Sequence, residues 1–427
     1  MNLPCEFLKR MKERLGEEFP AFLRSYETPP YRALRVNPLK TDPETFEGNP
    51  PFPLGDRVDR EPLGFYITEE KAGSYAEHFA GLYYLQEPSA MCAGALARGC
   101  NTARTLDLCA APGGKTTHLA SIMNGAGILI SNEIDGARAK ILSQNVERTG
   151  IRNCAVISAS PAQLSARFPE YFDLILADAP CSGEGMFKKE PEAIPHWSPN
   201  NVALCAARQR EILEDAAKML AGGGRLIYST CTFSEEEDEG QIRAFLSRHS
   251  EFALEREEKL YPHKYRGEGH YCARLYKKEG ARRNAKPYPV KGNAQANKAF
   301  SAFAEEFFEE LPTGEITALD DGRLYLVPDG MPALGVRVLR LGVELGEFDG
   351  KVFKPAHALA TSFRRAAYRR YLALSREEAE KYLHGETLAV QAENGWYAAG
   401  LGEYPLGLGK VVNGVLKNHY PKGLRKN

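Results

Sequence analysis

Apolar residues near the N-terminus recur with the period of a helix that buries one face; they are Leu3, Phe7, Leu8, Met11 and Leu15. This spacing predicts a mostly helical segment over residues 1–35. Residues 36–70 are instead rich in proline and in short, strand-like pieces. Together the two patterns predict a small N-terminal α/β module over residues 1–84.

Beyond residue 104 short apolar runs alternate with stretches of helical period. The expected strands are 105–109, 127–132, 155–158, 173–177 and 225–229. The expected helices are 115–123, 137–149, 202–220, which the three glycines 222–224 should end, and 234–248, which begins with serine and acids. This alternation predicts an α/β domain with a mostly parallel, Rossmann-like sheet over residues 85–278.

Three later segments define the remaining domain boundaries. Residues 269–277 predict a late strand that pairs antiparallel at the edge of the sheet. Residues 279–298 are polar and basic with little apolar content, which is typical of a linker. Residues 299–427 are rich in glycine, tyrosine and short strands, and they are expected to form a separate C-terminal region.

The composition narrows the class of protein. The chain has 427 residues, enough for two or three domains, and a net charge of −1, so a nucleic-acid surface would require local segregation of charge. None of its nine cysteines forms a C-x-x-C pair, which argues against a zinc ribbon or a redox dithiol. No apolar run has the length of a signal peptide or a membrane span. We therefore expect a soluble, cytoplasmic protein without a metal site.

A glycine-rich turn follows the first expected strand of the sheet and opens a helix, in the sequence DLCAAPGGKT. Its central residues are Cys109, Ala110, Ala111, Pro112, Gly113, Gly114 and Lys115. Such a turn places free backbone N–H groups and a helix N-terminus where a carboxylate can bind. A P-loop would need glycine where Cys109 stands, so a P-loop ATPase is a weak alternative. A structural turn without a ligand is the other alternative. Glu133, at the end of the next strand, is a candidate partner for ribose hydroxyls.

Two cysteines follow the buried strands 173–177 and 225–229. Cys181 stands in DAPCSG, which begins at Asp178, and Cys231 stands in STCTFS. Because the carboxyl ends of parallel strands meet at one edge of a sheet, both cysteines should lie beside the glycine-rich turn. A lone cysteine is usually an inert core residue, and a disulfide or a metal pair is conceivable. Two cysteines at the ligand edge instead favour a nucleophile and a helper group.

The motifs DLCAAPGGKT, DAPCSGEGMF and STCTFSEEEDE, in this order, resemble the signatures of the Nop/Sun family of RNA cytosine-C5 methyltransferases. Within the family the resemblance is greatest to bacterial enzymes for 16S ribosomal RNA, and it covers residues 20–280 and, more loosely, the C-terminal region. It implies S-adenosyl-L-methionine as cofactor, held by residues 109–115, with Glu133 on the ribose. It also implies that Cys231 is the nucleophile, that Cys181 assists product release, and that Asp178 contacts the base near the cofactor.

One position departs from the family pattern. Ser160 stands where the family usually has an aspartate that contacts the adenine. A serine can still donate or accept a hydrogen bond there, but it carries no charge. The reaction residues are intact, so the expected chemistry is unaffected. A thiolate that adds to C6 of cytosine makes C5 nucleophilic enough to accept a methyl group, and a nearby acid can assist at N3.

Basic residues suggest where RNA binds. Lys188 and Lys189 follow the second motif, and residues 351–375 contain six cations and no acid, with Tyr368 and Tyr371 interleaved as stacking surfaces. Those cations are Lys351, Lys354, Arg364, Arg365, Arg369 and Arg370. The tail adds Lys417, His419, Lys422, Arg425 and Lys426. The resemblance implies a PUA-like RNA-binding module in the C-terminal region.

The sequence therefore predicts RNA (cytosine-C5) methylation, with 16S ribosomal RNA or the 30S subunit as the expected substrate. The same chemistry on transfer RNA is the first alternative, and a non-catalytic RNA-binding assembly factor is a remote one. The position of the target cytosine and the oligomeric state cannot be predicted from the sequence, and a monomer is assumed.

Overall fold

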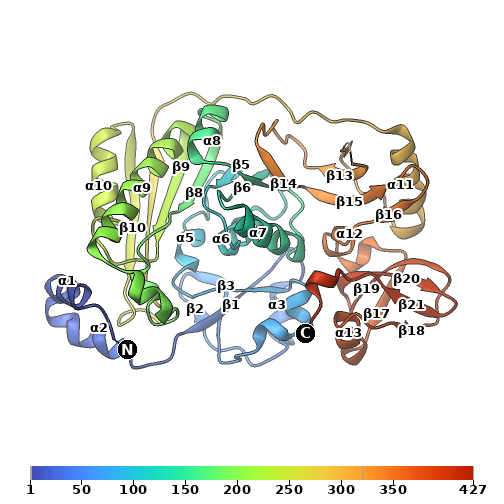
Figure 1. The fold of residues 1–427 in the computed structure, drawn as a ribbon, viewed down its shortest axis with the longest axis horizontal. Helices are drawn as coiled ribbons and strands as arrows, with labels where there is room; N and C mark the ends of the chain where they lie inside the picture. Colours follow the sequence, from blue (N-terminus) through green and yellow to red (C-terminus); the bar gives the residue numbers. More distant parts are fainter. Residues whose placement is uncertain (1, 320, 427) are drawn as a thin grey trace.

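A computed structural model describes residues 2–319 and 321–426 of the chain. Its centre is an eight-stranded sheet in the order β10-β11-β9-β8-β5-β6-β7-β14 (Figure 1). The strands are β5 (Arg104–Asp107), β6 (Ile128–Asn132), β7 (Cys154–Ser158), β8 (Phe172–Asp178), β9 (Leu220–Thr230), β10 (Phe252–Leu260), β11 (His270–Lys277) and β14 (Arg337–Leu341). The pairs within β7-β6-β5-β8-β9 are parallel, and the outer pairs are antiparallel.

Helices on both faces bury this sheet. They are α5 (Met91–Ala95), α6 (Gly114–Met123), α7 (Gly136–Arg148), α8 (Pro161–Arg167), α9 (Pro199–Met219) and α10 (Glu239–Arg248). Along β8, Ile175 belongs to one hydrophobic cluster, whereas Leu174 and Leu176 belong to the cluster on the opposite face. Both faces of the strand are therefore dry, which explains its unbroken apolar sequence. The predicted α/β, Rossmann-like fold is confirmed.

Several expected boundaries differ in the structure. Strand β11 pairs antiparallel with β9 as expected, but β10 and not β11 is the edge strand. Strand β9 begins at Leu220 and runs through the three glycines that were expected only to end the preceding helix. The helix predicted from Ser234 begins at Glu239, because the residues before it form a turn in which the side chains of Glu237 and Asp238 point into the protein.

The N-terminal residues form two units. Helices α1 (Cys5–Leu15) and α2 (Phe19–Ser25) pack through Phe7, Met11 and Phe22 against the loops after β8 and β9. A small sheet follows, in the order β2-β3-β1-β4, with α3 (Pro43–Gly48) and α4 (Ala76–Phe79). Its strands are β1 (Arg32–Val36), β2 (Arg57–Val58), β3 (Glu61–Ile67) and β4 (Tyr83–Leu85).

Arg35 joins this small sheet to the helix that opens after the glycine-rich turn. Its side chain is 1% exposed and donates hydrogen bonds to the Gly114 carbonyl (3.1 Å), the Thr117 hydroxyl (2.8 Å) and the Ser121 hydroxyl (3.1 Å). Asn37 is also buried, and its amide donates to the carbonyls of Gly81 and Thr149. These two residues therefore stabilise the junction between the small sheet and the central domain.

The C-terminal region is less separate than its sequence suggests. Residues 278–293 run over the top of the molecule in Figure 1 to α11 (Ala294–Phe307), so the last residues of the expected 279–298 linker are helical. One sheet contains β12 (Glu315–Ala318), β13 (Arg323–Val327), β15 (Val343–Phe348) and β16 (Phe353–Pro355), and β14 from the same region joins the central sheet. The expected boundary at 298 therefore does not separate two independent sheets.

The last sheet returns to the N-terminal module. It contains β17 (Tyr371–Leu374), β18 (Leu388–Ala389), β19 (Gly395–Leu401), β20 (Tyr404–Val412) and β21 (Val415–Asn418), beside α12 (Ala358–Thr361) and α13 (Arg376–Leu383). Leu383 and Tyr397 share one hydrophobic cluster with Leu34 and Phe65 of the N-terminal sheet. The C-terminus accordingly lies beside α3 (Figure 1). Among the described residues, no helix is both long and apolar enough to cross a membrane.

Lys40 lies between the N-terminal module and the C-terminal region, and its substitution tests how this contact contributes to stability. Its side chain is buried, donates to the Thr361 carbonyl, and is near the cations Arg148 and Arg364. Burial lowers the pKa of Lys40 to about 7, whereas the unfolded value is about 10.4. The cost of burying the ammonium group is therefore fully present below pH 7 and decreases as the pH rises towards the unfolded value.

We expect Lys40→Met to raise the melting temperature at pH 6 and to have a smaller effect near pH 9.5, because methionine removes the buried charge. Thermal unfolding of both proteins at the two pH values measures this, with the exposed Lys9→Met as control. An equal decrease at both pH values would contradict it, because the hydrogen bond to Thr361 would then outweigh the desolvation cost.

Candidate active site

The carboxyl ends of β8 and β9 bring the two cysteine motifs together. The Sγ atoms of Cys181 and Cys231 are 3.3 Å apart, and both cysteines are free thiols of intermediate exposure. The backbone N–H of Cys231 also contacts the Cys181 sulfur at 3.4 Å. The hydrogen bond to the Cys231 sulfur, together with burial, raises the pKa of Cys181 well above its ordinary value. Cys181 is therefore protonated at neutral pH and can donate to, or exchange a proton at, the neighbouring sulfur.

Asp178 closes β8 beside this pair and is held by two donors. Its carboxylate is 2.7 Å from the Lys115 ammonium and accepts a hydrogen bond of 2.7 Å from the Ser229 hydroxyl. Burial raises the pKa of Asp178, but the charges of Lys115 and His270 and the hydrogen bonds outweigh it, so that the net pKa is lowered. The carboxylate is thus ionised and keeps 29% of its side chain exposed towards a ligand.

Lys115 belongs to the glycine-rich turn in the sequence, and in the structure it also forms an ion pair with Asp178. Burial lowers its pKa, but the charge of Asp178 and an interaction with Cys231 give a net increase. The ammonium group is consequently charged and lies near both the acid and the sulfur of Cys231.

The glycine-rich turn has the geometry that a small anionic group requires. Gly113 adopts φ 118°, in the left-handed region, and α6 begins at the next residue. Only glycine adopts this conformation without strain, and the first N–H groups of α6 have no partner within the helix. The turn is held from behind by the buried Asp107, which accepts a hydrogen bond of 2.6 Å from the Thr116 hydroxyl. Burial raises the pKa of Asp107 to about 7.

Glu133 and Ser160 stand on the next two strand ends. The Glu133 carboxylate accepts the Asp135 N–H at 3.0 Å and lies 3.3 Å from Arg138. Ser160 is the N-cap of α8, where its hydroxyl oxygen accepts the Gln163 N–H at 3.3 Å and the Gln163 side chain accepts the Ser160 N–H at 2.9 Å. The Ser160 hydroxyl proton is left for another acceptor, so its predicted contact with an adenine stays a prediction.

Two of the residues proposed to contact RNA are buried. Lys188 forms an ion pair of 3.2 Å with Glu268 and is 8% exposed, and Tyr368 is 0% exposed with its hydroxyl bonded to the carbonyls of Leu359 and Ala360. The prediction that Tyr368 offers a stacking surface is therefore wrong, because the aromatic residues around it form a core cluster. Lys189, Lys351 and Lys417 are exposed and stay candidates.

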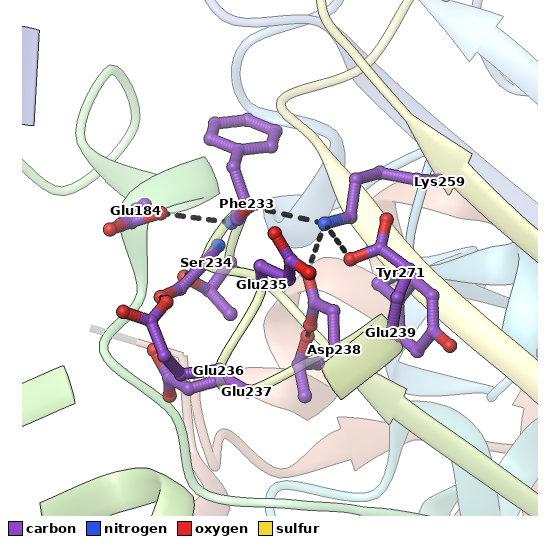
Figure 2. A network of polar contacts seen from close by, with 12 residues as sticks. Glu184, Phe233, Ser234, Glu235, Glu236, Glu237, Asp238, Glu239, Lys259 and Tyr271 are labelled. Atoms are coloured by element: carbon purple, nitrogen blue, oxygen red, sulfur yellow. Dashed lines mark hydrogen bonds and ion pairs between the residues drawn. The ribbon is translucent and has the colours of Figure 1, made fainter. Parts of the chain in front are cut away.

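A group of buried acids, which the sequence pattern does not predict, lies behind the cysteines. Glu184, Glu237 and Asp238 are each at most 2% exposed. Burial raises the pKa of Glu237 to about 7 and that of Asp238 to about 8. Figure 2 shows the acidic turn, residues 234–239, with Lys259 bonded to Phe233, Asp238 and Glu239 and with Glu184 bonded to the Phe233 N–H. In the sequence, the run of acids at residues 235–239 is typical of a helix start. Only the tertiary structure reveals these contacts.

No group of three or more histidine, cysteine and acidic side chains within residues 2–319 and 321–426 is arranged to hold a metal ion. The polar groups of the site are instead two thiols, one ionised acid and one ammonium group. That set suits acid–base and nucleophilic chemistry on an organic substrate.

The sequence matches four family models in chain order. They are the N-terminal domain of 16S rRNA methyltransferase RsmF (residues 3–88), 16S rRNA methyltransferase RsmB/F (97–276), the RsmF rRNA methyltransferase first C-terminal domain (302–363) and the methyltransferase RsmF PUA domain (369–426). The predicted PUA-like module is confirmed, and it is preceded by a separate domain.

Whole-chain relatives agree with these matches. Proteins named ribosomal RNA small subunit methyltransferase F from Cronobacter sakazakii and Klebsiella pneumoniae are 33% and 34% identical, over 99% of this chain and 96% of each relative. A solved methyltransferase homologue from Pyrococcus horikoshii is 28% identical with a TM-score of 0.55, covering 61% of this chain and 91% of that protein. NSun6 from the same organism has a TM-score of 0.58 at 20% identity, covering 65% and 98%, which shows the fold alone.

A Rossmann-like sheet with its polar site at the strand ends, and family matches over nearly its whole length, define this protein as an RNA methyltransferase. The chain belongs to the RsmF family of ribosomal RNA small subunit methyltransferases.

Proposed function

We propose that the protein transfers a methyl group from S-adenosyl-L-methionine to carbon 5 of a cytosine in 16S ribosomal RNA, with Cys231 as the nucleophile. The observation that carries the proposal is the pair of sulfurs 3.3 Å apart at the ends of β8 and β9, next to the ion pair of Asp178 and Lys115. The resemblance in the three motifs and the names of the whole-chain relatives support the same reaction.

The residues of the turn fit the cofactor. The N-terminus of α6 suits the carboxylate of its amino-acid part, and Glu133, an acid at the end of β6, suits its ribose hydroxyls. When bound, S-adenosyl-L-methionine would supply a methyl group on a sulfonium, which leaves as a neutral thioether. Cys109, Ala110, Ala111 and Pro112 would line the turn, and Asp178 and Lys115 would stand between cofactor and base.

The protein residues would act in a defined order. The sulfur of Cys231 would bond to C6 of the cytosine while its proton is lost and N3 gains one, through solvent, so that the C5–C6 π electrons become available at C5. Asp178 would accept a hydrogen bond from the protonated ring. The electron pair displaced to C5 forms the new carbon–carbon bond to the methyl group. The C5 proton would then leave to a base, the C5–C6 double bond would re-form as the C6–S bond breaks, and N3 would lose its added proton as the Cys231 sulfur regains one. Cys181, whose sulfur touches that of Cys231, is placed to assist this last step.

The substrate can be tested directly. Naked 16S ribosomal RNA, assembled 30S subunits and transfer RNA would each be incubated with the protein and methyl-labelled S-adenosyl-L-methionine, and then sequenced after bisulfite treatment. We expect 5-methylcytosine in the 16S RNA. Labelling of transfer RNA alone would instead establish the first alternative substrate. Binding of RNA without methyl transfer to any of the three substrates would establish the non-catalytic alternative.

Asp178 gives a prediction about the acid. Asp178→Asn keeps the size of the side chain but removes the charge that faces Lys115 and the base, so kcat should fall by about 10²- to 10³-fold. Single-turnover methylation measures this effect. Asp173→Asn is the matched control, because Asp173 lies on the same strand but pairs with Arg104 and Arg282 at the opposite edge. Equal kcat values for Asp178→Asn and the wild type would contradict the role.

A further inference from the structure

Glu237 comes from the acidic turn after Cys231 but contacts the loop that carries the other cysteine. It is 0% exposed, and its Oε1 accepts the Ser182 N–H at 2.9 Å while its Oε2 accepts the Ser182 hydroxyl at 2.5 Å. The side-chain amide of Gln209 also donates a hydrogen bond to Oε1 of Glu237, at 2.9 Å. The same amide donates to the Pro180 carbonyl at 3.0 Å. The residues on either side of Cys181 are thus both fixed through Glu237 and its partner Gln209.

A chain of hydroxyl groups extends this contact to the second cysteine. The Ser182 oxygen is 2.8 Å from the Thr232 hydroxyl, and Thr232 follows Cys231 directly. Because the Ser182 proton is donated to Glu237, the Thr232 hydroxyl must donate to Ser182. The Thr232 oxygen in turn accepts the Ser234 N–H at 3.4 Å. The Glu237 carboxylate is therefore linked through Ser182 to the residue that follows Cys231.

The neighbouring acid completes the arrangement on the other side of Cys231. Asp238 accepts the Thr230 hydroxyl at 2.5 Å and forms an ion pair of 2.8 Å with Lys259. Among the hydrogen bonds of the described residues, the Glu237 carboxylate makes none with either sulfur and accepts from Ser182 and Gln209. Glu237 therefore acts on the position of the two loops through Ser182, and its charge also contributes to the raised pKa of Cys181.

We propose that Glu237 is a positioning residue that fixes the Cys181 loop against Cys231 and so sets the rate at which the methylated product is released. The proposal rests on the proposed function, in which Cys231 bonds to the RNA and Cys181 assists its departure. Because Glu237 contacts Ser182 directly and Thr232 only through Ser182, its loss should displace Cys181 more than Cys231. The covalent bond would then still form but break slowly.

The test compares Glu237→Ala with Glu237→Gln. The alanine variant leaves the Ser182 and Gln209 donors without an acceptor, and kcat should fall by about 10- to 100-fold, the effect of a small misplacement of a reacting group. The glutamine can keep both donors on its oxygen and donate from its nitrogen to Ser182, which then donates to Thr232. It should retain most of the activity. Glu235→Ala is the control, because Glu235 lies on the same turn but is exposed and pairs with Arg243.

The distinguishing readout is a covalent protein–RNA complex on a denaturing gel. During turnover it should accumulate with Glu237→Ala and with Cys181→Ala, but not with Glu237→Gln, Glu235→Ala or the wild type. Wild-type turnover by Glu237→Ala, a loss of activity without the complex, or no rescue by glutamine would each overturn the proposal.

Two further outcomes are also decisive. If Glu237→Ala does not fold, Ser182→Ala, which removes only the hydroxyl links, should show the same accumulation to a smaller extent, and its absence overturns the proposal. If Cys181→Ala itself forms no complex, the proposed role of Cys181 fails. The proposal for Glu237, which depends on that role, then fails with it, whereas failure of the Glu237 variants alone leaves the proposed function intact.

Discussion

Replacing Cys231 with alanine is expected to lower methyl transfer at least about a thousandfold, the order of loss that follows removal of a covalent nucleophile. Binding of S-adenosyl-L-methionine and RNA should change by no more than a few fold, because removal of this sulfur leaves the N-terminus of α6 and Glu133 in place. Single-turnover methylation and equilibrium binding measure the two quantities.

The matched control is Cys5→Ala, because Cys5 is an exposed thiol at the start of α1. It should leave the rate unchanged and so exclude a general requirement for thiols. Transfer by Cys231→Ala at the wild-type rate would show that C5 is activated without this sulfur.

Replacing Cys181 with alanine is expected to stop turnover after one event and to leave the protein bonded to its RNA. The two sulfurs are 3.3 Å apart, so Cys181 is the group nearest to the bond that must break. Burial and the hydrogen bond to Cys231 keep Cys181 protonated, and it can give its proton to the departing thiolate. The complex should survive denaturation and appear as a band of reduced mobility that contains labelled RNA.

The double variant Cys181→Ala, Cys231→Ala serves as the control for this complex, because it lacks the sulfur that bonds to C6. It should give no band. Rapid turnover by Cys181→Ala, or a band that persists in the double variant, would contradict the assignment of the two roles.

Much of the central sheet could be predicted from sequence because its strands are buried on both faces. The expected strands 127–132 and 173–177 contain the continuous apolar runs 128–130 and 174–177, and they correspond to β6 and β8. Strand β10 was not predicted, because its central residues are charged and exposed and only Phe252 and Leu260 at its ends are buried. Strand β14 was not predicted either. It is short and pairs with β7, which is distant in the sequence, so this pairing is evident only in the folded chain.

The candidate site shows the same division. Cys181, Cys231 and Asp178 could be placed together from sequence alone, since each follows a strand of the parallel sheet. The ion pair between Lys115 and Asp178 could not, because it joins residues from two motifs that no spacing rule connects. Glu237 was hidden for another reason: buried acids look like exposed ones in a sequence, and five neighbouring acids are typical of a helix start.

The basic segments were the least predictable part. A cation count cannot distinguish a lysine on the surface from one such as Lys188, which pairs with the buried Glu268. Tyr368 is placed by its neighbours in an aromatic core, and its own sequence context does not show this. Exposure is a property of the packed structure, so charge patterns alone overestimate the RNA surface.

The central claim is that the sulfur of residue 231 bonds to the target base. The Cys181→Ala protein would be incubated with 16S ribosomal RNA or 30S subunits and S-adenosyl-L-methionine, digested with nuclease and protease, and its peptides analysed by mass spectrometry. The predicted result is a single modified peptide that carries a methylated cytidine nucleotide on Cys231. A nucleotide on any other residue, or an unmodified Cys231 in a protein that still methylates RNA, would contradict the account.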